Sequence, residues 1–230
     1  MFKAPGIKLN LNNRLVIQDK LLIRRFGPSD RNALRQLCSD TAFMGRPVEI
    51  FLKDRDLFAD WATVYYTDYE PESIFLAECD KRIVGYIMGC LKEKECDRIF
   101  SRELYPKLLR RSLNSLLLEP SSRALLFNLG RSFLRGEFKR PDFSKIYPAH
   151  LHINVDSGFR GSGIGSGLLN KFMNYLVSRG VKAVRLATIS KKANRFFEKS
   201  HFGLLYRKRM TYFDYLLQEK LYLSIYGKML

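Results

Sequence analysis

The nine residues Phe159-Arg160-Gly161-Ser162-Gly163-Ile164-Gly165-Ser166-Gly167 join an alternating segment to an amphipathic one. Residues 150–155 before them alternate polar and apolar side chains with the period of a strand. After them, apolar residues recur at four-residue spacing from Ile164 to Leu176, which predicts a helix that ends at Gly180. Unpaired N–H groups of the first helical turn would then lie beside glycines that let a ligand approach the backbone closely. Residues 159–167, called the glycine turn below, are therefore predicted to bind a phosphate or a similar anion.

Spacing separates the phosphate motifs that a glycine-rich turn can represent. A dinucleotide fingerprint would need a glycine at Ser166 or Leu168, and the Gly-Lys-Ser/Thr string of a P-loop does not occur. Arg160-x-x-Gly163-x-Gly165, with Val155 five residues before the arginine, instead resembles motif A of the GNAT superfamily of acyl-CoA N-acyltransferases. This resemblance implies that the backbone of the turn holds the pyrophosphate of coenzyme A. It also implies that Val155 hydrogen-bonds the pantetheine arm and the acetyl group. The residues that match the pyrophosphate site are Arg160, Gly161, Ser162, Gly163, Ile164, Gly165 and Ser166.

The resemblance continues after the predicted helix. Residues 181–187 are predicted to form the next strand, and residues 190–202 resemble the family pattern N-x-x-A-x-x-F-Y-E-K-x-G-F. Two positions depart from that pattern. Ser190 stands at the asparagine, and Phe197 stands at the tyrosine whose hydroxyl commonly protonates the leaving thiolate in the family. Both departures weaken the transfer of family roles to these positions.

A shorter resemblance covers residues 147–153. Tyr147-Pro148-Ala149-His150-Leu151-His152-Ile153 is similar to the fourth strand of the acetyltransferase-like domain of O-GlcNAc hydrolases. The His-x-His pair is also similar to serotonin N-acetyltransferase. These matches imply a branch of the family and no particular substrate, and the hydrolase-associated domain implies that a member can keep the fold and lose activity.

The remaining segments predict an α/β (α+β) chain with the GNAT fold, a mixed and mostly antiparallel sheet flanked by helices. Strands are expected at residues 20–26, 73–79, 83–90, 204–213 and 221–226, and helices at 30–41 and 48–66. Residues 1–230 are predicted to be one domain with a helical insertion at about 92–148, between the third and fourth strands. Pro120 and Pro141 are expected to break it into two or three helices. It could serve as a lid on the acceptor side, a homodimer contact or a basic surface for peripheral membrane contact.

Charge is unevenly distributed along the chain. Residues 160–230 hold 14 basic and 3 acidic residues of a chain whose net charge is +17. A positive field there would attract the polyanionic coenzyme, and no nucleic-acid-binding motif accompanies it, so no specific nucleic acid is expected. Residues 54–80, called the acidic segment, hold eight acidic residues against Arg55 alone. This segment favours a cationic amine if it borders the acceptor site, and is otherwise a solvated surface.

Composition indicates a cytoplasmic protein without a metal. No window is long and apolar enough to cross a membrane, and residues 1–20 lack the apolar core of a signal peptide. The four cysteines form no C-x-x-C pair, and with three histidines they give no zinc spacing. Reduced, mostly buried thiols are expected.

The chemistry expected from the resemblance is direct attack of a neutral amine on the acetyl thioester of acetyl-CoA. Alternation places His150, His152 and Asn154 on one face of their strand. An imidazole suits a base at neutral pH, so His152 and then His150 are the candidate catalytic residues, with Asp68 or Glu70 next if neither acts. A histidine on a strand is also often only a hydrogen-bonding group. The predicted function is an N-acetyltransferase acting on a primary amine of a small molecule or peptide; the alternative is a weak or inactive binding module that works through its helical insertion.

Overall fold

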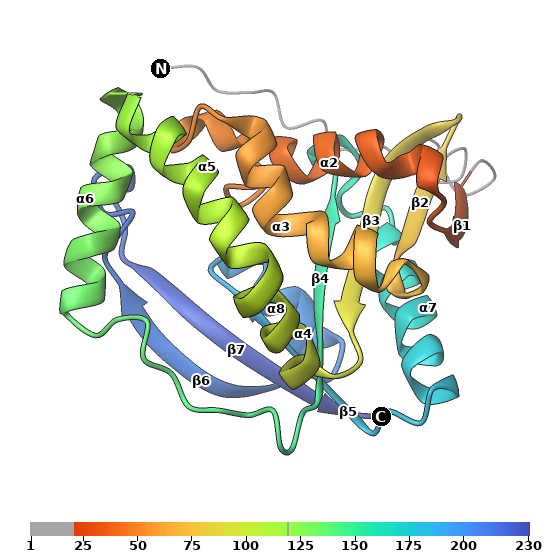
Figure 1. The fold of residues 1–230 in the computed structure, drawn as a ribbon. Helices are drawn as coiled ribbons and strands as arrows, with labels where there is room; N and C mark the ends of the chain where they lie inside the picture. The colour runs from red at the N-terminus through yellow and green to blue at the C-terminus, as the bar shows by residue number, and fades with distance from the viewer. Residues whose placement is uncertain (1–20, 119) are drawn as a thin grey trace.

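The segments with strand periodicity form one seven-stranded sheet (Figure 1). The computed structural model describes residues 21–118 and 120–230. The strand order is β1-β2-β3-β4-β5-β7-β6, and every neighbouring pair is antiparallel except β4 with β5. The bounds are β1 (Leu21–Arg25), β2 (Phe75–Cys79), β3 (Arg82–Cys90), β4 (Ala149–Val155), β5 (Ala183–Thr188), β6 (Gly203–Met210) and β7 (Leu221–Met229). The predicted fold class is confirmed, whereas the expectation about a signal peptide falls on residues 1–20 and lies outside the described residues.

Two helices precede the hairpin of β2 and β3. They are α2 (Arg31–Asp40) and α3 (Arg55–Tyr69). The sequence predicted one helix over residues 48–66, but the structure has a 3-10 turn at Val48–Ile50 and begins α3 later. Asp54 explains the later start, because its carboxylate caps α3 by accepting a hydrogen bond from the Leu57 N–H at 2.8 Å. Asp80 and Lys81 form the turn between β2 and β3, and both have positive φ, as a two-residue type I′ hairpin turn requires.

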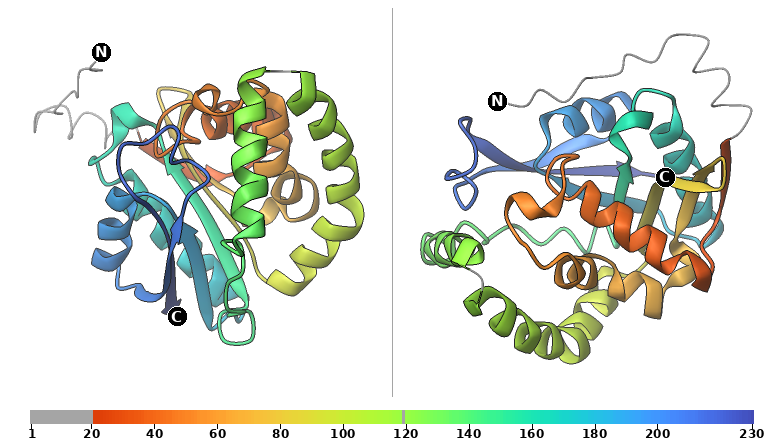
Figure 2. Two further views of the ribbon diagram at one scale, coloured as in Figure 1. Left: turned by 90° about the vertical axis from the view of Figure 1, so that its left-hand side faces the viewer. Right: turned by 90° about the horizontal axis from the view of Figure 1, so that it is seen from above.

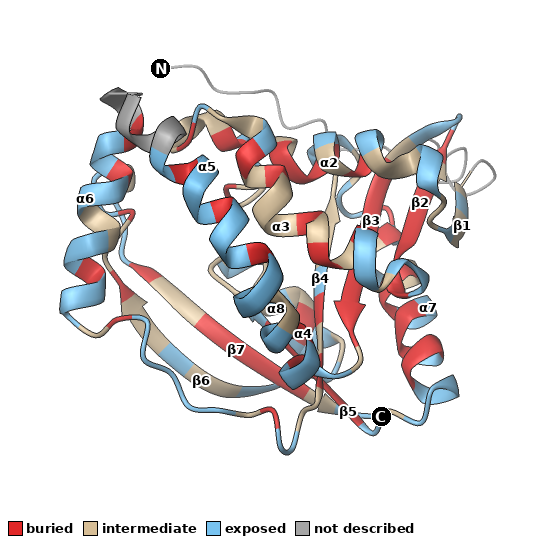
Figure 3. Cartoon of the chain, in the orientation of Figure 1, coloured by how far each residue is buried: buried red, intermediate tan, exposed pale blue. Residues whose placement is uncertain are grey.

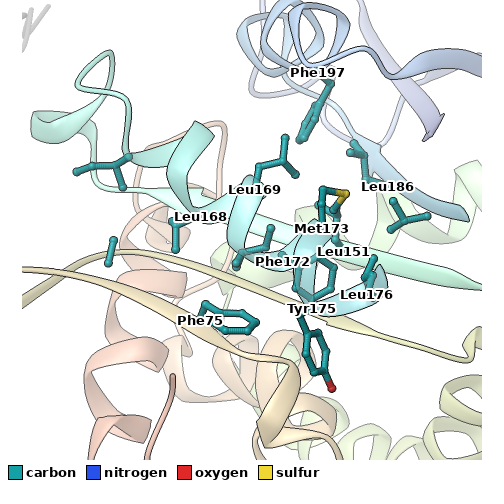
Figure 4. Packing of buried hydrophobic residues seen from close by; sticks show 14 of the residues in the cluster. Phe75, Leu151, Leu168, Leu169, Phe172, Met173, Tyr175, Leu176, Leu186 and Phe197 are labelled. Carbon is teal, nitrogen blue, oxygen red and sulfur yellow. The ribbon is translucent and has the colours of Figure 1, made fainter. Parts of the chain in front are cut away.

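Helices cover both faces of the sheet (Figure 2). On one face lie α7 (Ile164–Ser178) and α8 (Lys191–Lys199). The apolar stripe of α7 packs on the sheet through Leu168, Phe172 and Leu176, each fully buried, beneath Phe197 of α8 (Figure 4). The other face carries α2, α3 and the helical insertion. The side chains that alternate along β4 therefore point into two different helical layers.

The helical insertion between the third and fourth strands is also confirmed. It comprises α4 (Glu93–Ile99), a π turn (Phe100–Leu104), α5 (Tyr105–Leu118) and α6 (Pro120–Leu134). Pro120 begins α6, as a proline at the first helical position can, and Pro141 lies in the irregular segment that leads to β4. None of the helices within the described residues has both the length and the apolar character needed to cross a bilayer.

Several polar contacts attach the insertion to the rest of the molecule, among them one in α5 and one after α6. In α5, Ser112 accepts a hydrogen bond from the Trp61 indole of α3 at 3.0 Å. After α6, the Glu137 carboxylate accepts from the backbone N–H and the hydroxyl of Thr211, both at 2.7 Å, beside the turn between β6 and β7. The outer side of α6 is open, and Phe133 is 72% exposed (Figure 3).

Arginines neutralise much of the acidic segment. Its ion pairs join Asp56 and Asp60 to Arg35, Asp54 and Asp60 to Arg111, Asp68 to Arg31 and Glu78 to Arg24. These pairs connect α2, α3, α5 and the first two strands. Much of the acidic segment therefore takes part in an ion-pair network between helices, while Asp56, Asp68, Glu72 and Asp80 are also exposed to solvent.

Candidate functional site

The glycine turn lies between β4 and α7, as the sequence predicted. Gly161 and Gly163 have φ of 79° and 91°, left-handed values that side chains other than glycine adopt at a cost. Gly163 is the N-cap of α7, and a Cβ on it would meet no atom of the described residues within 4 Å. The N–H groups of the first turn of α7 have no partner within the helix. The unpaired N–H groups of α7 and the unobstructed space beside Gly163 thus lie at the same place. This is the geometry of an anion-binding site.

The side chains of the glycine turn are engaged by the protein itself. Ser162 is buried and its hydroxyl donates to the Phe159 carbonyl at 2.6 Å, so only its backbone is available to a ligand. Arg160 donates from Nε to the Val155 carbonyl at 3.1 Å, which ties the turn to the end of β4. The guanidinium of Arg160 lies against Gly45, where a Cβ would be 2.2 Å from Nη1. Sequence reasoning missed Gly45, because its local sequence, Met44-Gly45-Arg46, gives no signal that it faces Arg160.

The strands β4 and β5 separate beside this turn. They pair only at Ala149 with Val184 and at His150 with Arg185. Beyond His150, the edge of β4 that faces β5 has no paired strand among the described residues. Apart from the Val155 carbonyl, which accepts from Arg160, the backbone groups on this edge can hydrogen-bond an extended ligand chain that leads away from the glycine turn.

The three polar side chains of β4 share one face of the sheet, as the alternation predicted, and α2 and α3 cover that face. Two of them share one partner, because the Tyr86 hydroxyl of β3 accepts from Asn154 Nδ2 at 2.9 Å and lies 3.1 Å from His152 Nε2. The His152 and Tyr86 rings also stack, with centroids 5.7 Å apart. Tyr86 is fully buried, whereas His152 is exposed. Because β4 is the central strand, an exposed side chain on it means that the helical layer leaves an opening above His152.

His150 has a different environment. Its Nε2 lies 2.6 Å from the Tyr66 hydroxyl and its Nδ1 lies 3.0 Å from Cys90 Sγ, so both ring nitrogens are engaged. Burial lowers the pKa of His150 to about 4, with a smaller contribution from the nearby His152 and Arg140. Burial also lowers the pKa of His152 to about 4, although His152 is more accessible to solvent than His150. Both imidazoles are neutral at pH 7 and able to accept a proton.

Neither of the other two candidate bases is free. Asp68 pairs with Arg31 at the surface. Glu70 accepts from the Leu91 N–H and from the Tyr65 hydroxyl, each at 2.9 Å, and burial raises the pKa of its carboxyl. These bonds give both carboxylates a structural role.

The two departures from the family pattern have structural explanations. Ser190 caps α8, where its hydroxyl accepts from the Ala193 N–H at 3.4 Å. Phe197 is 3% exposed and packs in the core against the rings of Phe196, Phe202 and Tyr226. It is Phe196 that lies beside the glycine turn, 3.4 Å from where a Cβ on Gly165 would be.

Comparisons with known proteins agree with this geometry. Residues 136–202, which include β4, the glycine turn, α7 and α8, match the model of the acetyltransferase (GNAT) family. The fold is similar to the crystal structure of SsHAT, with 23% identity over 91% of this chain and 98% of that one and a TM-score of 0.68. It is also similar to arylalkylamine N-acetyltransferase 2 from Aedes aegypti (14% identity, 91% and 98% covered, TM-score 0.59). A third similar structure is the Drosophila melanogaster polyamine N-acetyltransferase (14%, 91% and 100%, 0.56). At these identities the structural likeness establishes the shared fold.

Proposed function

We propose that this chain, which carries a GNAT acetyltransferase family domain, transfers the acetyl group of acetyl-CoA to a primary amine of a small molecule or peptide. The observation that carries the proposal is the glycine turn, where the space beside Gly163, at the N-terminus of α7, is unobstructed. The free edge of β4 runs from that point toward His152. A ligand with a phosphate at one end and an extended arm at the other fits this arrangement.

The residues that would hold the coenzyme are those of the glycine turn and the end of β4. Backbone N–H groups from Gly161 to Ser166 would bind the pyrophosphate, since the hydroxyl of Ser162 is occupied. Arg160 keeps the turn against Val155, and the basic excess of residues 160–230 would draw in the polyanion. The bound thioester would supply the acetyl group for direct attack by the amine.

His152 is the residue proposed to remove the proton from the incoming ammonium, directly or through a water. Its ring is exposed at the opening over β4, and Tyr86 and Asn154 hold it in place. His150, enclosed by Tyr66 and Cys90, is the second candidate. The leaving thiolate has a pKa near that of a free thiol, so water can protonate it without the tyrosine that Phe197 replaces.

The acceptor is proposed only as an amine. Similar structures include enzymes named for arylalkylamines and for polyamines, which supports that class. The helical insertion lies on the face of the sheet that carries α2 and α3 (Figure 2), and His152 is on that face beside Tyr86. This supports the role of the insertion as a lid on the acceptor side. A homodimer through residues 92–148, peripheral membrane contact, the similarity to the O-GlcNAc hydrolase domain and a cytoplasmic location stay predictions.

The test is steady-state release of coenzyme A thiol from acetyl-CoA across a panel of amines, peptides and aminosugars, with calorimetric titration of coenzyme A alongside. Turnover with at least one amine, together with saturable coenzyme binding, is the expected result. Coenzyme binding without turnover on any acceptor would favour the alternative of a binding module. Absence of coenzyme binding would refute the proposed acetyl transfer.

A further inference from the structure

Two cysteines and a histidine converge where the helical insertion leaves the sheet. Cys90 ends β3, His150 faces it across the ladder on β4, and Cys96 lies on α4. One ligand atom from each lies within 4.8 Å of the other two. Cys90 is fully buried and Cys96 is 6% exposed. This group, called the thiol–imidazole cluster, brings together the side chains that bind zinc most often.

From this cluster we infer a binding site for Zn²⁺ that fastens the start of the helical insertion to the sheet. Tetrahedral zinc has Zn–S distances near 2.3 Å and Zn–N distances near 2.0–2.1 Å, so its ligand atoms lie roughly 3.5–3.8 Å apart. The three atoms of the cluster are already within about an ångström of that spacing. Binding releases the two thiol protons, and the resulting thiolates balance the charge of the ion. A solvent molecule would complete the fourth position.

The surroundings of His150 fit the role of a ligand. Histidines that bind a metal through one ring nitrogen usually donate from the other to a fixed acceptor, which sets the orientation of the ring. The Tyr66 hydroxyl lies 2.6 Å from Nε2 and can be that acceptor, which leaves Nδ1 directed at the thiols. Arg185, opposite His150 on β5, forms a buried ion pair with Glu93, so its charge does not oppose a cation nearby.

Zinc in this position would act on structure rather than on the reaction. The site joins the last residue of β3, the first full helix of the insertion and the second residue of β4. His152, the proposed base, lies one strand repeat away with its own partner, Tyr86. The inference does not depend on acetyl transfer, because its test measures the metal.

The experiment measures the zinc content of the full chain, purified with a thiol reductant and without chelators. We expect about one zinc per chain in the wild type and at least a tenfold lower content in Cys96→Ala. The matched control is Cys79→Ala, because Cys79 is also 6% exposed but lies on β2, outside the cluster. That variant should keep its zinc. Addition of a chelator should lower the melting temperature of the wild type and of this control, but not that of Cys96→Ala.

A second measurement protects the test against misfolding of Cys96→Ala. Cobalt added to the metal-free, reduced wild type should give thiolate-to-Co²⁺ charge-transfer absorption and the strong visible bands of a tetrahedral site. Lack of zinc and of these bands in the reduced wild type would overturn the inference. So would equal zinc in Cys96→Ala and Cys79→Ala. A Cys90–Cys96 disulfide whose reduced form binds neither metal would overturn it as well.

Discussion

The glycine turn and the polar face of β4 lie next to each other but are built differently. The turn is one continuous run, and its ligand-binding geometry follows from glycines and a helix N-terminus within nine residues. The polar face is assembled from α3, β3, α4 and β4, so that His150 contacts Tyr66, 84 positions away. The comparison teaches that the sequence specifies the first site locally, whereas the second acquires its chemistry only from the fold. The predictions below test that difference.

The largest effect on activity is expected for His152, the proposed general base on the polar face of β4. His152→Ala should lower kcat/KM by about 100-fold or more, the usual contribution of a general base, without lowering the melting temperature. His150→Ala should reduce the melting temperature and affect the rate less, because its ring is enclosed by Tyr66 and Cys90. Steady-state kinetics and thermal unfolding measure both.

The control for these variants is His201→Asn. His201 is exposed just after α8 and has a φ of 62°, which asparagine tolerates. The kcat/KM of this variant should therefore equal that of the wild type. If His150→Ala lost as much activity as His152→Ala while still folding, the assignment of the two histidines would be reversed.

The glycine turn should respond to a single substitution at its N-cap. Gly163→Val should weaken coenzyme A binding by at least about 30-fold, which corresponds to the ~2 kcal/mol that an anion can gain at a helix N-terminus. The added side chain would fill the open approach. Gly180→Val is a matched control, since Gly180 also has a left-handed φ and open space, but at the other end of α7. Calorimetry should show a loss of affinity for the first variant alone, and equal affinities would remove the basis of the proposed function.

The Glu137 carboxylate is one of the groups that attach the helical insertion to the rest of the molecule. Burial alone would raise the pKa of Glu137, but the hydrogen bonds from Thr211 outweigh it and leave the pKa lowered. Since the folded pKa lies below the unfolded one, the stabilisation is present above about pH 4.5 and is lost as pH falls through the folded pKa. Glu137→Gln should therefore cost about 1–2 kcal/mol at pH 7 and less in acid, measured by urea unfolding. The same change at exposed Glu219 should have little effect at either pH.

The smallest effect is expected in the acidic segment. Asp68→Asn removes a surface pair with Arg31 and should change the free energy of unfolding by less than about 1 kcal/mol. The KM for a cationic amine should stay unchanged, because the carboxylate serves the ion-pair network. A tenfold rise in KM for cationic amines, with none for neutral acyl acceptors, would instead mean that the acidic segment borders the acceptor site.

Sequence periodicity was sufficient for the strands, α7 and the helical insertion, because each has a local pattern that burial reinforces. It failed at residues 48–66, where the cap formed by Asp54 divides the segment, since a capping bond competes locally with helix continuation. It also missed the thiol–imidazole cluster, because Cys90 and His150 are 60 positions apart and meet only through strand register. The partners of His152 and the arginines that pair with the acidic segment come from other elements in the same way.

Cys90 and His150 lie opposite each other on β3 and β4, and this pairing affects which changes of length the chain tolerates. Residues 91–149 leave the sheet and return to it at opposing positions of one antiparallel pair. A segment with such adjoining ends can lengthen, shorten or be exchanged while β3 and β4 keep their register, as a hairpin loop can. The register of β3 and β4 therefore does not depend on the length of the insertion, and a short turn in its place should preserve their pairing while exposing what the helices contribute to acceptor choice.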